Sequence, residues 1–184
     1  MSANEEKKDF MKKVTVLVDT REQVNKHITD AFEALGIMYT REKLDMGDYS
    51  FRVGDRDFSR ACVIERKAGA DELYGNLTAD RARIEKEFES LSKNVRQCVL
   101  LIENISGWTH LKGTEIPESV AARQGRKVRN IGESVYATLQ SWRCGNRFGF
   151  SVEFVPDTRS TARKILELFF WYWHNYRKQT AARR

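Results

Sequence analysis

Three short apolar runs, each ending in charged residues, place the strongest limit on how this chain can fold. They are VTVLVD at 14–19, ACVIERK at 61–67 and CVLLIE at 98–103. Runs of this length and composition are typical of buried strands. Segments with helical spacing separate them. This order predicts an α/β fold with a mixed central sheet flanked by helices.

The remaining elements follow from periodicity. Tyr49, Phe51 and Val53 alternate with polar residues, and a turn at 54–57 joins this strand to the 61–64 strand in a hairpin. Apolar spacing predicts helices at 22–35, 71–77, 79–91, 134–143 and 158–176, and a strand at 148–155. We expect a flexible leader at 1–13, one domain at 14–176 and a basic tail at 177–184.

Composition narrows the class of protein. The 184 residues are 41 % hydrophobic and 32 % charged, with a formal charge of +6, which suits a polyanionic partner. No apolar run reaches the length of a membrane span, so no membrane partner is expected. Three widely spaced cysteines argue against a disulfide scaffold and favour a reducing compartment. Cys62 and Cys98 lie in apolar runs and are predicted to be buried.

The charged residues at the end of the 61–67 run are the strongest candidates for a catalytic site. Side chains of a strand alternate between faces, so Glu65 and Lys67 project to one side and Arg66 to the other. A carboxylate and an ammonium at this spacing can share a site with a divalent cation. Asp48, at the entry to the same hairpin, is the natural second oxygen ligand for Mg²⁺, which takes few carboxylates and keeps several waters.

These motifs resemble a known family. Gly47-Asp48-Tyr49, followed by Glu65-Arg66-Lys67 and Asp71, resembles the nuclease motif of the XPF-type structure-specific endonucleases, which share a restriction-endonuclease-like core. The stretches DTRE at 19–22, VLLIE at 99–103 and LQSW at 139–142 look like other parts of that domain. The resemblance extends from about residue 14 to about residue 175. Many family members continue into helix-hairpin-helix modules, and we expect none within these 184 residues.

The resemblance implies roles for individual residues. Asp48 and Glu65, with the backbone carbonyl of Arg66, would bind Mg²⁺, and Mn²⁺ would be able to substitute. Lys67 would position the attacking water. Asp19 and Asp71 would support the metal site. Arg21, Glu22 and Arg81 would contact DNA.

Two groups of charged residues can be interpreted in more than one way. Asp19 and Glu22 can instead cap the first helix of the domain, where the helix dipole favours carboxylates. A basic group in the long 104–131 segment is either a phosphate-contacting loop beside the active site or an ordinary solvated loop. It consists of Arg123, Arg126, Lys127 and Arg129.

The sequence ILELFFWYWHNY at 165–176 predicts a helix that is apolar over most of its circumference. Such a helix packs in the core of its own domain. Its surplus of aromatic residues also indicates a protein interface, and the resemblance implies a homodimer or heterodimer through this region. The candidate interface residues are Phe169, Phe170, Trp171 and Trp173. Base stacking is a third interpretation.

Taken with these residues, the resemblance implies a metal-dependent endonuclease that hydrolyses DNA at flaps, forks or other branches, in repair or recombination. The alternatives are a non-catalytic DNA-binding or scaffold subunit, and a restriction-like or RNA-directed nuclease with the same metal core. The expected location is the cytoplasm of a prokaryotic or viral host, or the nucleus of a eukaryote.

Overall fold

The computed structural model describes residues 2–116, 122, 130–145 and 147–182. The chain divides into two compact units, of which unit 1 comprises Met1–Glu65 and Thr158–Arg184, and unit 2 comprises Arg66–Asp157. Unit 1 is therefore discontinuous in sequence, and unit 2 is one uninterrupted stretch.

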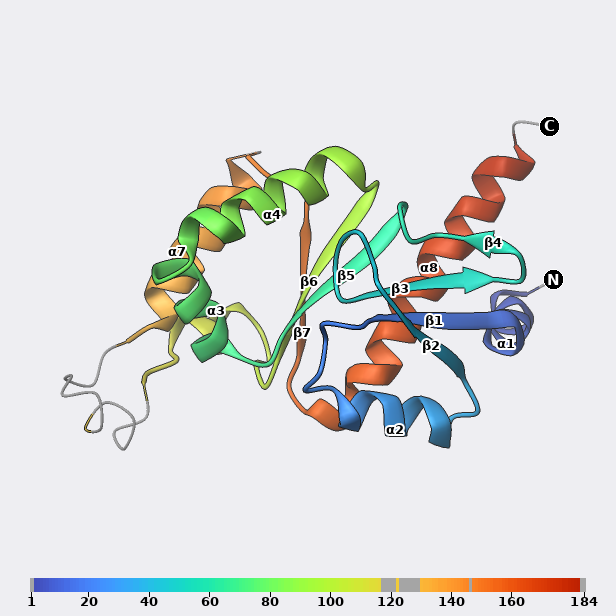
Figure 1. The fold of residues 1–184 in the computed structure, drawn as a ribbon, viewed down its shortest axis with the longest axis horizontal. Helices are drawn as coiled ribbons and strands as arrows, with labels where there is room; N and C mark the ends of the chain where they lie inside the picture. Colours follow the sequence, from blue (N-terminus) through green and yellow to red (C-terminus); the bar gives the residue numbers. More distant parts are fainter. Residues whose placement is uncertain (1, 117–121, 123–129, 146, 183–184) are drawn as a thin grey trace. The chain divides into compact units, whose positions relative to one another are not determined.

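Unit 1 is built on a mixed sheet (Figure 1). Its strands are β1 (Val14–Asp19), β2 (Met38–Glu42), β3 (Tyr49–Val53), β4 (Arg56–Asp57) and β5 (Cys62–Lys67), whose last two residues belong to unit 2. Strand β1 is parallel to β2 and antiparallel to β3, and β3 is antiparallel to both β4 and β5. The predicted hairpin and the predicted α/β fold with a mixed sheet are both confirmed.

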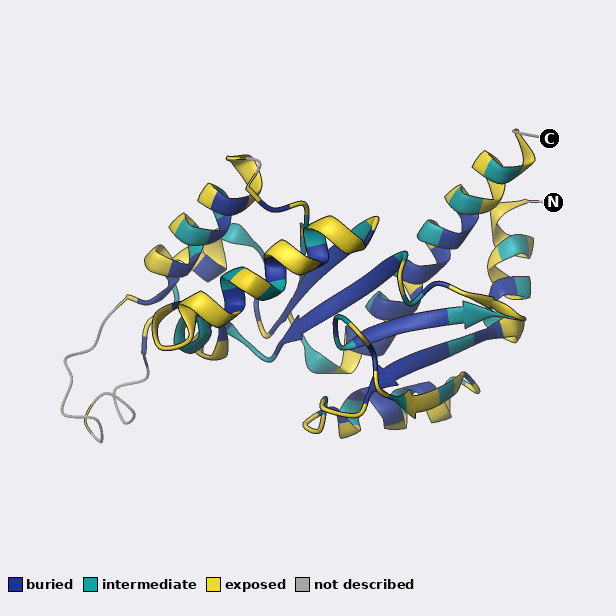
Figure 2. Ribbon diagram, turned by 45° about the horizontal axis from the view of Figure 1, so that its top comes forward, coloured by how far each residue is buried: buried dark blue, intermediate teal, exposed yellow. Residues whose placement is uncertain are grey.

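The helices of unit 1 come from both ends of its sequence. They are α1 (Ala3–Lys13), α2 (Lys26–Ala34) and α8 (Thr161–Ala181), with a 3₁₀ turn, η1 (Thr158–Ser160), before α8. Helix α8 packs against both α1 and α2. Figure 2 shows that β5 and most of β1 and β3 are buried, while the outer sides of the helices are exposed.

The first thirteen residues differ from the expected flexible leader. Ser2 and Glu5 form a capping box at the start of α1, in which each side chain binds the backbone N–H of the other residue. Phe10, the buried residue of α1, packs against Phe51, Phe170 and Trp173, at ring-centroid distances of 6.0, 5.7 and 5.4 Å. Tertiary packing of this single ring therefore orders a helix whose sequence is otherwise charged.

Unit 2 consists of two parallel strands and four described helices. The strands are β6 (Gln97–Glu103) and β7 (Ser151–Val155), and all five residues of β7 pair with the last five residues of β6. The helices are α3 (Ala70–Thr78), α4 (Arg81–Asn94), α5 (Trp108–Lys112) and α7 (Gly132–Cys144). They enclose a core that contains Leu73, Phe88, Leu100, Leu139 and Trp142.

Two predictions about environment can be compared with the structure. Cys62 and Cys98 are buried, as predicted, and Cys144 is exposed. Burial raises the pKa of the Cys62 thiol to about 12. Among the described residues, no helix combines the length and the apolar character needed to cross a membrane.

Candidate active site

The candidate site is centred on the end of β5, a strand whose six residues are all buried. Its apolar part, Cys62–Ile64, is anchored in the core and holds the charged residues that follow in a fixed direction. Glu65 is 4 % exposed and Lys67 is 7 % exposed. Two residues apart in a regular strand, their side chains project to the same face. Burying charged groups is costly unless they have partners, so such a pair is typical of a functional site.

Asp48 is brought to this strand end by the loop before β3. Its backbone N–H donates to the Ile64 carbonyl at 2.9 Å, and its own carbonyl accepts from the Asp19 N–H at 2.9 Å. Asp48 is therefore fixed between the last residue of β1 and the residue that precedes Glu65. The acidic residues of β1, the β3 entry and β5 all lie at the same end of these adjacent strands.

Gly47 makes the close approach of this loop possible. Its φ of +72° lies in the left-handed region, and a Cβ at this position would come within 3.0 Å of the Val63 Cβ and 3.2 Å of the Ile64 carbonyl oxygen. A side chain at 47 would thus strain the backbone and push Asp48 away from β5.

Asp19 is buried and anchors the loop that leads to Asp48. Its carboxylate accepts two hydrogen bonds from the Arg21 guanidinium, at 2.7 and 2.9 Å, and one from the Arg21 backbone at 2.7 Å. The Leu44 N–H donates to it at 2.8 Å, and the Leu44 carbonyl accepts from Arg21. Burial raises the pKa of Asp19, but the hydrogen bonds from Arg21 and Leu44 outweigh it, so the pKa is lowered overall.

This arrangement bears on the helix-cap alternative. Helix α2 begins only at Lys26, after Asn25, so neither Asp19 nor Glu22 stands at its N-cap position. Glu22 is half-buried, and its N–H donates to the Asp19 carbonyl at 3.1 Å. The DTRE segment forms a tight turn at the strand end instead of the first turn of a helix.

In unit 2, the end of β5 is held by a polar network that the sequence did not reveal. The side chains of Arg66 and Glu103, 6 % and 1 % exposed, form an ion pair at 2.5 Å, which places Arg66 away from the face of Glu65 and Lys67. Glu72 lies 3.7 Å from the Lys67 ammonium and accepts from the Ala68 N–H at 2.8 Å. The Lys67 ammonium thus has a carboxylate neighbour on α3.

Asn104 completes the network. It follows Glu103 with a φ of 59°, a left-handed conformation that Asn adopts more readily than most residues. Its side-chain amide donates to the Ala68 carbonyl at 2.9 Å. The β6 end therefore holds the backbone immediately after Lys67.

A sequence signal existed for part of this network. Glu72 is the third residue of α3, where a carboxylate often accepts from backbone N–H groups just before the helix. The positions of Glu103 and Asn104 relative to Arg66 and Ala68, by contrast, depend on a pairing across 37 and 36 residues.

Other predicted site residues lie outside this network. Asp71 is exposed in the first turn of α3. Arg81 is exposed at the start of α4, where its side chain pairs with Glu85 at 2.9 Å and lies 5.9 Å from the Trp142 ring. The predicted basic loop residues Arg123, Arg126, Lys127 and Arg129 fall outside the described part of the chain.

The four candidate interface residues occupy two environments. Phe169, Phe170 and Trp173 are 0 %, 1 % and 7 % exposed within unit 1, where Phe169 stacks on Phe51 at 4.6 Å. Trp171 is 47 % exposed. The core interpretation of this helix describes the first three, and of the four only Trp171 presents a large surface to a partner.

The donor set at the strand ends fits a hard divalent cation. Asp48 and Glu65 offer carboxylate oxygens, and within the described residues no group of three or more His, Cys, Asp or Glu side chains is placed to hold a metal. Two protein carboxylates with water completing the shell is the pattern that Mg²⁺ prefers, whereas a structural Zn²⁺ site takes four Cys or His ligands.

Comparisons with known proteins agree with this architecture. The family model described as the ERCC4 domain matches residues 18–168. The solved structure of XPF from Aeropyrum pernix is similar with a TM-score of 0.57 and 21 % identity, over 84 % of this chain and 59 % of that chain. The structure described as XPF from Aeropyrum pernix, complex with DNA, gives a TM-score of 0.58 and 20 % identity, over 88 % and 65 %.

This chain thus spans less than two thirds of the length of either solved XPF chain. At this identity the likeness shows a shared fold. No curated protein matches the sequence.

Proposed function

Because the chain belongs to the ERCC4 domain family, we propose that it is a divalent-metal-dependent endonuclease that hydrolyses phosphodiester bonds in DNA. The observation that supports this most is the convergence of Asp48 and Glu65 at neighbouring strand ends, with the buried amine of Lys67 two residues beyond Glu65. An inert strand end has no need of buried charges in this combination.

The chain's own residues have distinct parts in this proposal. Asp48 and Glu65, with the Arg66 carbonyl, would hold Mg²⁺ or Mn²⁺, which when bound polarises a phosphoryl oxygen and acidifies a water. Lys67 orients the attacking water. Its ammonium, held near Glu72, also offers positive charge to the phosphate.

Supporting roles fall to residues that fix the backbone. Asp19 and Arg21 hold the loop before Asp48, and Arg66 and Glu103 hold β5. We propose Asp19 as a positioning residue, because its carboxylate is already engaged by four hydrogen bonds, with Glu22 in the same turn. Asp71, which is exposed, would support the metal site, and Arg81, which is also exposed, would contact DNA.

Structure specificity, a role in repair or recombination, and dimerisation through the Trp171 face of α8 are further parts of the proposal. They rest on the family and on the similarity to XPF from Aeropyrum pernix, one structure of which is in complex with DNA. A DNA substrate implies a location with access to DNA, either the cytoplasm of a prokaryotic or viral host or a eukaryotic nucleus.

The test is cleavage of a panel of flap, fork, junction, duplex and single-stranded DNA with Mg²⁺ or Mn²⁺. Asp48→Ala and Glu65→Ala should each lower the cleavage rate by on the order of 10³-fold, since metal stabilisation of several kcal/mol is lost. Lys67→Ala should lower it by about 10²-fold or more. DNA affinity in the absence of metal should be unchanged in all three.

Asp45→Ala is the matched control, because Asp45 is an exposed carboxylate of the same loop that pairs with Arg60. It should cut at the parental rate. Parental cutting by Asp48→Ala or Glu65→Ala would refute the site. DNA binding by the parent with no cutting of any substrate would identify a scaffold subunit instead, and cutting confined to RNA would replace the proposed substrate.

A further inference from the structure

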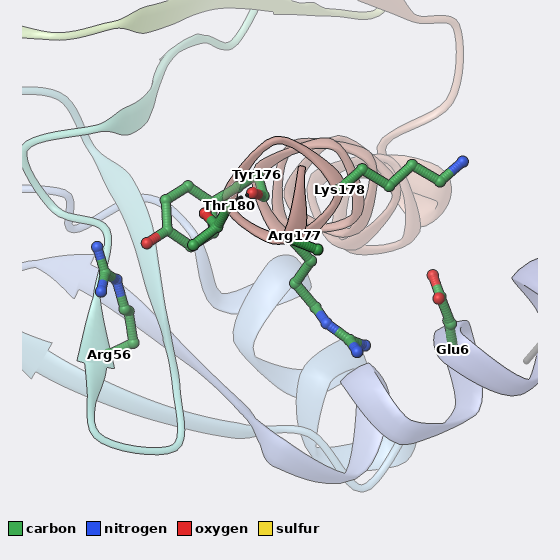
Figure 3. Close-up of a pocket in the computed structure, with 7 residues that line it drawn as sticks. Glu6, Arg56, Tyr176, Arg177, Lys178 and Thr180 are labelled. Carbon is green, nitrogen blue, oxygen red and sulfur yellow. Dashed lines mark hydrogen bonds between the residues drawn. The ribbon is translucent and has the colours of Figure 1, made fainter. Parts of the chain in front are cut away.

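A second charged region lies at the C-terminal end of α8, within unit 1. An open groove of about 580 Å³ is lined by residues of α8, α1 and the β3–β4 hairpin. Figure 3 looks along α8 and shows Arg56 on one side, Arg177 and Lys178 on the helix, and Glu6 on α1. We call these residues, with Tyr176, Thr180 and Ala181, the basic groove.

The cations of the basic groove are available for a ligand. Arg56, Arg177 and Lys178 are exposed, and in the described part of the chain none of them forms an ion pair with a carboxylate. The acidic side chain in the lining, Glu6, is already engaged by His174 through a short contact to Nδ1. The groove therefore presents a net positive charge.

Aromatic rings hold two of these cations in place. The Arg56 guanidinium lies 4.8 Å from the centroid of Tyr176, and the Arg177 guanidinium lies 4.8 Å from that of Trp173. An arginine stacked on a ring keeps its hydrogen-bond donors free at the edge and loses less conformational entropy on binding an anion.

A purely structural role explains only part of this arrangement. Cations near a helix C-terminus interact favourably with the helix dipole, which accounts for Lys178 in the last turn of α8. It does not account for Arg56, which comes from strand β4 and reaches the groove through Tyr176. Convergence of cations from two separate elements is typical of a surface that binds anions.

The groove is remote from the candidate active site within the same unit. Asp48 precedes β3, whereas Arg56 follows the turn at the other end of β3, so eight positions separate them along the chain. The five residues of β3 alone span about 17 Å at roughly 3.3 Å per residue. This separation excludes a direct part for the groove in hydrolysis.

We propose that the basic groove binds phosphate groups of the DNA backbone away from the scissile bond and so increases affinity for the substrate. The inference rests on the proposed function, because DNA is the polyanion on which that function acts. Arginines with free planar donors suit phosphate oxygens. Phosphate contacts of this kind give affinity and register without reading sequence.

The test compares DNA binding by two triple variants of the full chain, each in an Asp48→Asn background that prevents cutting. The groove variant is Arg56→Ala/Arg177→Ala/Lys178→Ala. The control variant, Lys26→Ala/Lys93→Ala/Lys112→Ala, removes the same charge from surface lysines that pair with Asp30, Glu89 and Glu133. Fluorescence anisotropy with a labelled DNA fork is recorded between about 50 and about 200 mM salt.

The groove variant should bind at least about tenfold more weakly, and the slope of log K against log salt should fall by about 2 to 3, or roughly 0.9 for each lost phosphate contact. The control variant should keep the parental slope. With Asp48 restored, the groove variant should retain the parental rate at saturating DNA and raise KM. Circular dichroism melting checks that all variants are folded.

A parental slope in the folded groove variant would overturn the proposal. The proposal would also be overturned if the groove variant bound DNA as well as the parent but no longer bound polyglutamate. That outcome would assign the groove to an acidic protein partner. The proposed function fails separately, through absence of cutting by the parent, and a reduced salt slope in that case would still establish the groove.

Discussion

Charged side chains are buried at the end of β5 and exposed in the basic groove. At the end of β5, charged side chains are buried, and Asp19, Arg66 and Glu103 are tied to partners on other segments. In the basic groove, the two arginines and Lys178 are exposed, and the arginines lie over aromatic rings. The first arrangement suits chemistry, which needs groups held in place before the substrate arrives, and the second suits a mobile polyanion.

The comparison implies a difference in stability as well as in function. A buried charge is stabilised by its partner, so removing the partner leaves an uncompensated buried charge and lowers the unfolding free energy. Exposed cations are solvated by water, so changing their neighbours alters the unfolding free energy little. Three substitutions test this contrast, beginning with the largest expected effect.

Removing Glu103 should be the most damaging of the three. Glu103→Ala leaves the buried Arg66 guanidinium without its carboxylate and should cost about 3–5 kcal/mol of unfolding free energy, measured by urea denaturation. The double variant Arg66→Met/Glu103→Leu should recover most of that loss, because it removes both charges and keeps apolar volume. If Glu103→Ala unfolds at the parental urea concentration, the pair does not stabilise the strand end.

Asp19 should give an intermediate effect that depends on pH. Because its folded pKa is lowered, its contribution to stability is complete above its unfolded pKa of about 3.9 and is lost as pH falls through the folded value. Asp19→Asn should therefore be less stable than the parent by about 2 kcal/mol at neutral pH, since hydrogen bonds to a charged group are lost. The difference should shrink below about pH 4.

The measurement is a series of urea titrations at several pH values. The control is Asp30→Asn, which neutralises an exposed carboxylate of unit 1 that pairs with Lys26. It should change stability little at any pH. If the difference in unfolding free energy between Asp19→Asn and the parent grows as the pH is lowered, the pH dependence is opposite to that expected. Anchoring of Asp19 by Arg21 and Leu44 would then be excluded.

The basic groove should show the smallest effect on stability. Arg177→Ala removes a cation that stacks on Trp173 and should change the unfolding free energy by about 0.5–1 kcal/mol or less. A loss as large as that of Glu103→Ala would mean that Arg177 is part of the core of unit 1, and the contrast between the two regions would no longer hold.

The sequence predicted the local parts of the site well. The alternation of Glu65, Arg66 and Lys67 is a property of one strand, and burial of that strand follows from CVI directly before it. The hairpin that brings Asp48 near β5 was also readable, because alternating apolar residues and a turn specify it.

What the sequence did not predict depends on segments far apart in the chain. The bond from Leu44 to Asp19 spans 25 residues, and nothing in the spacing of DTRE distinguishes this partner from a helix N-terminus. Helix α1 was missed because only Phe10 and Met11 are large and apolar in its charged sequence. Its capping box, Ser2 with Glu5, was a local signal that could have indicated it.

The discontinuity of unit 1 has a consequence for how the chain is made. Phe10 is synthesised long before Phe170 and Trp173, two of the rings that surround it. Unit 2 is contiguous and has its own hydrophobic core, so it can collapse before α8, which unit 1 needs to complete its core, has been synthesised. The strand ends of unit 1, which include Asp19 and Asp48, can therefore pack fully only after α8 has been synthesised and the long loop formed by unit 2 has closed.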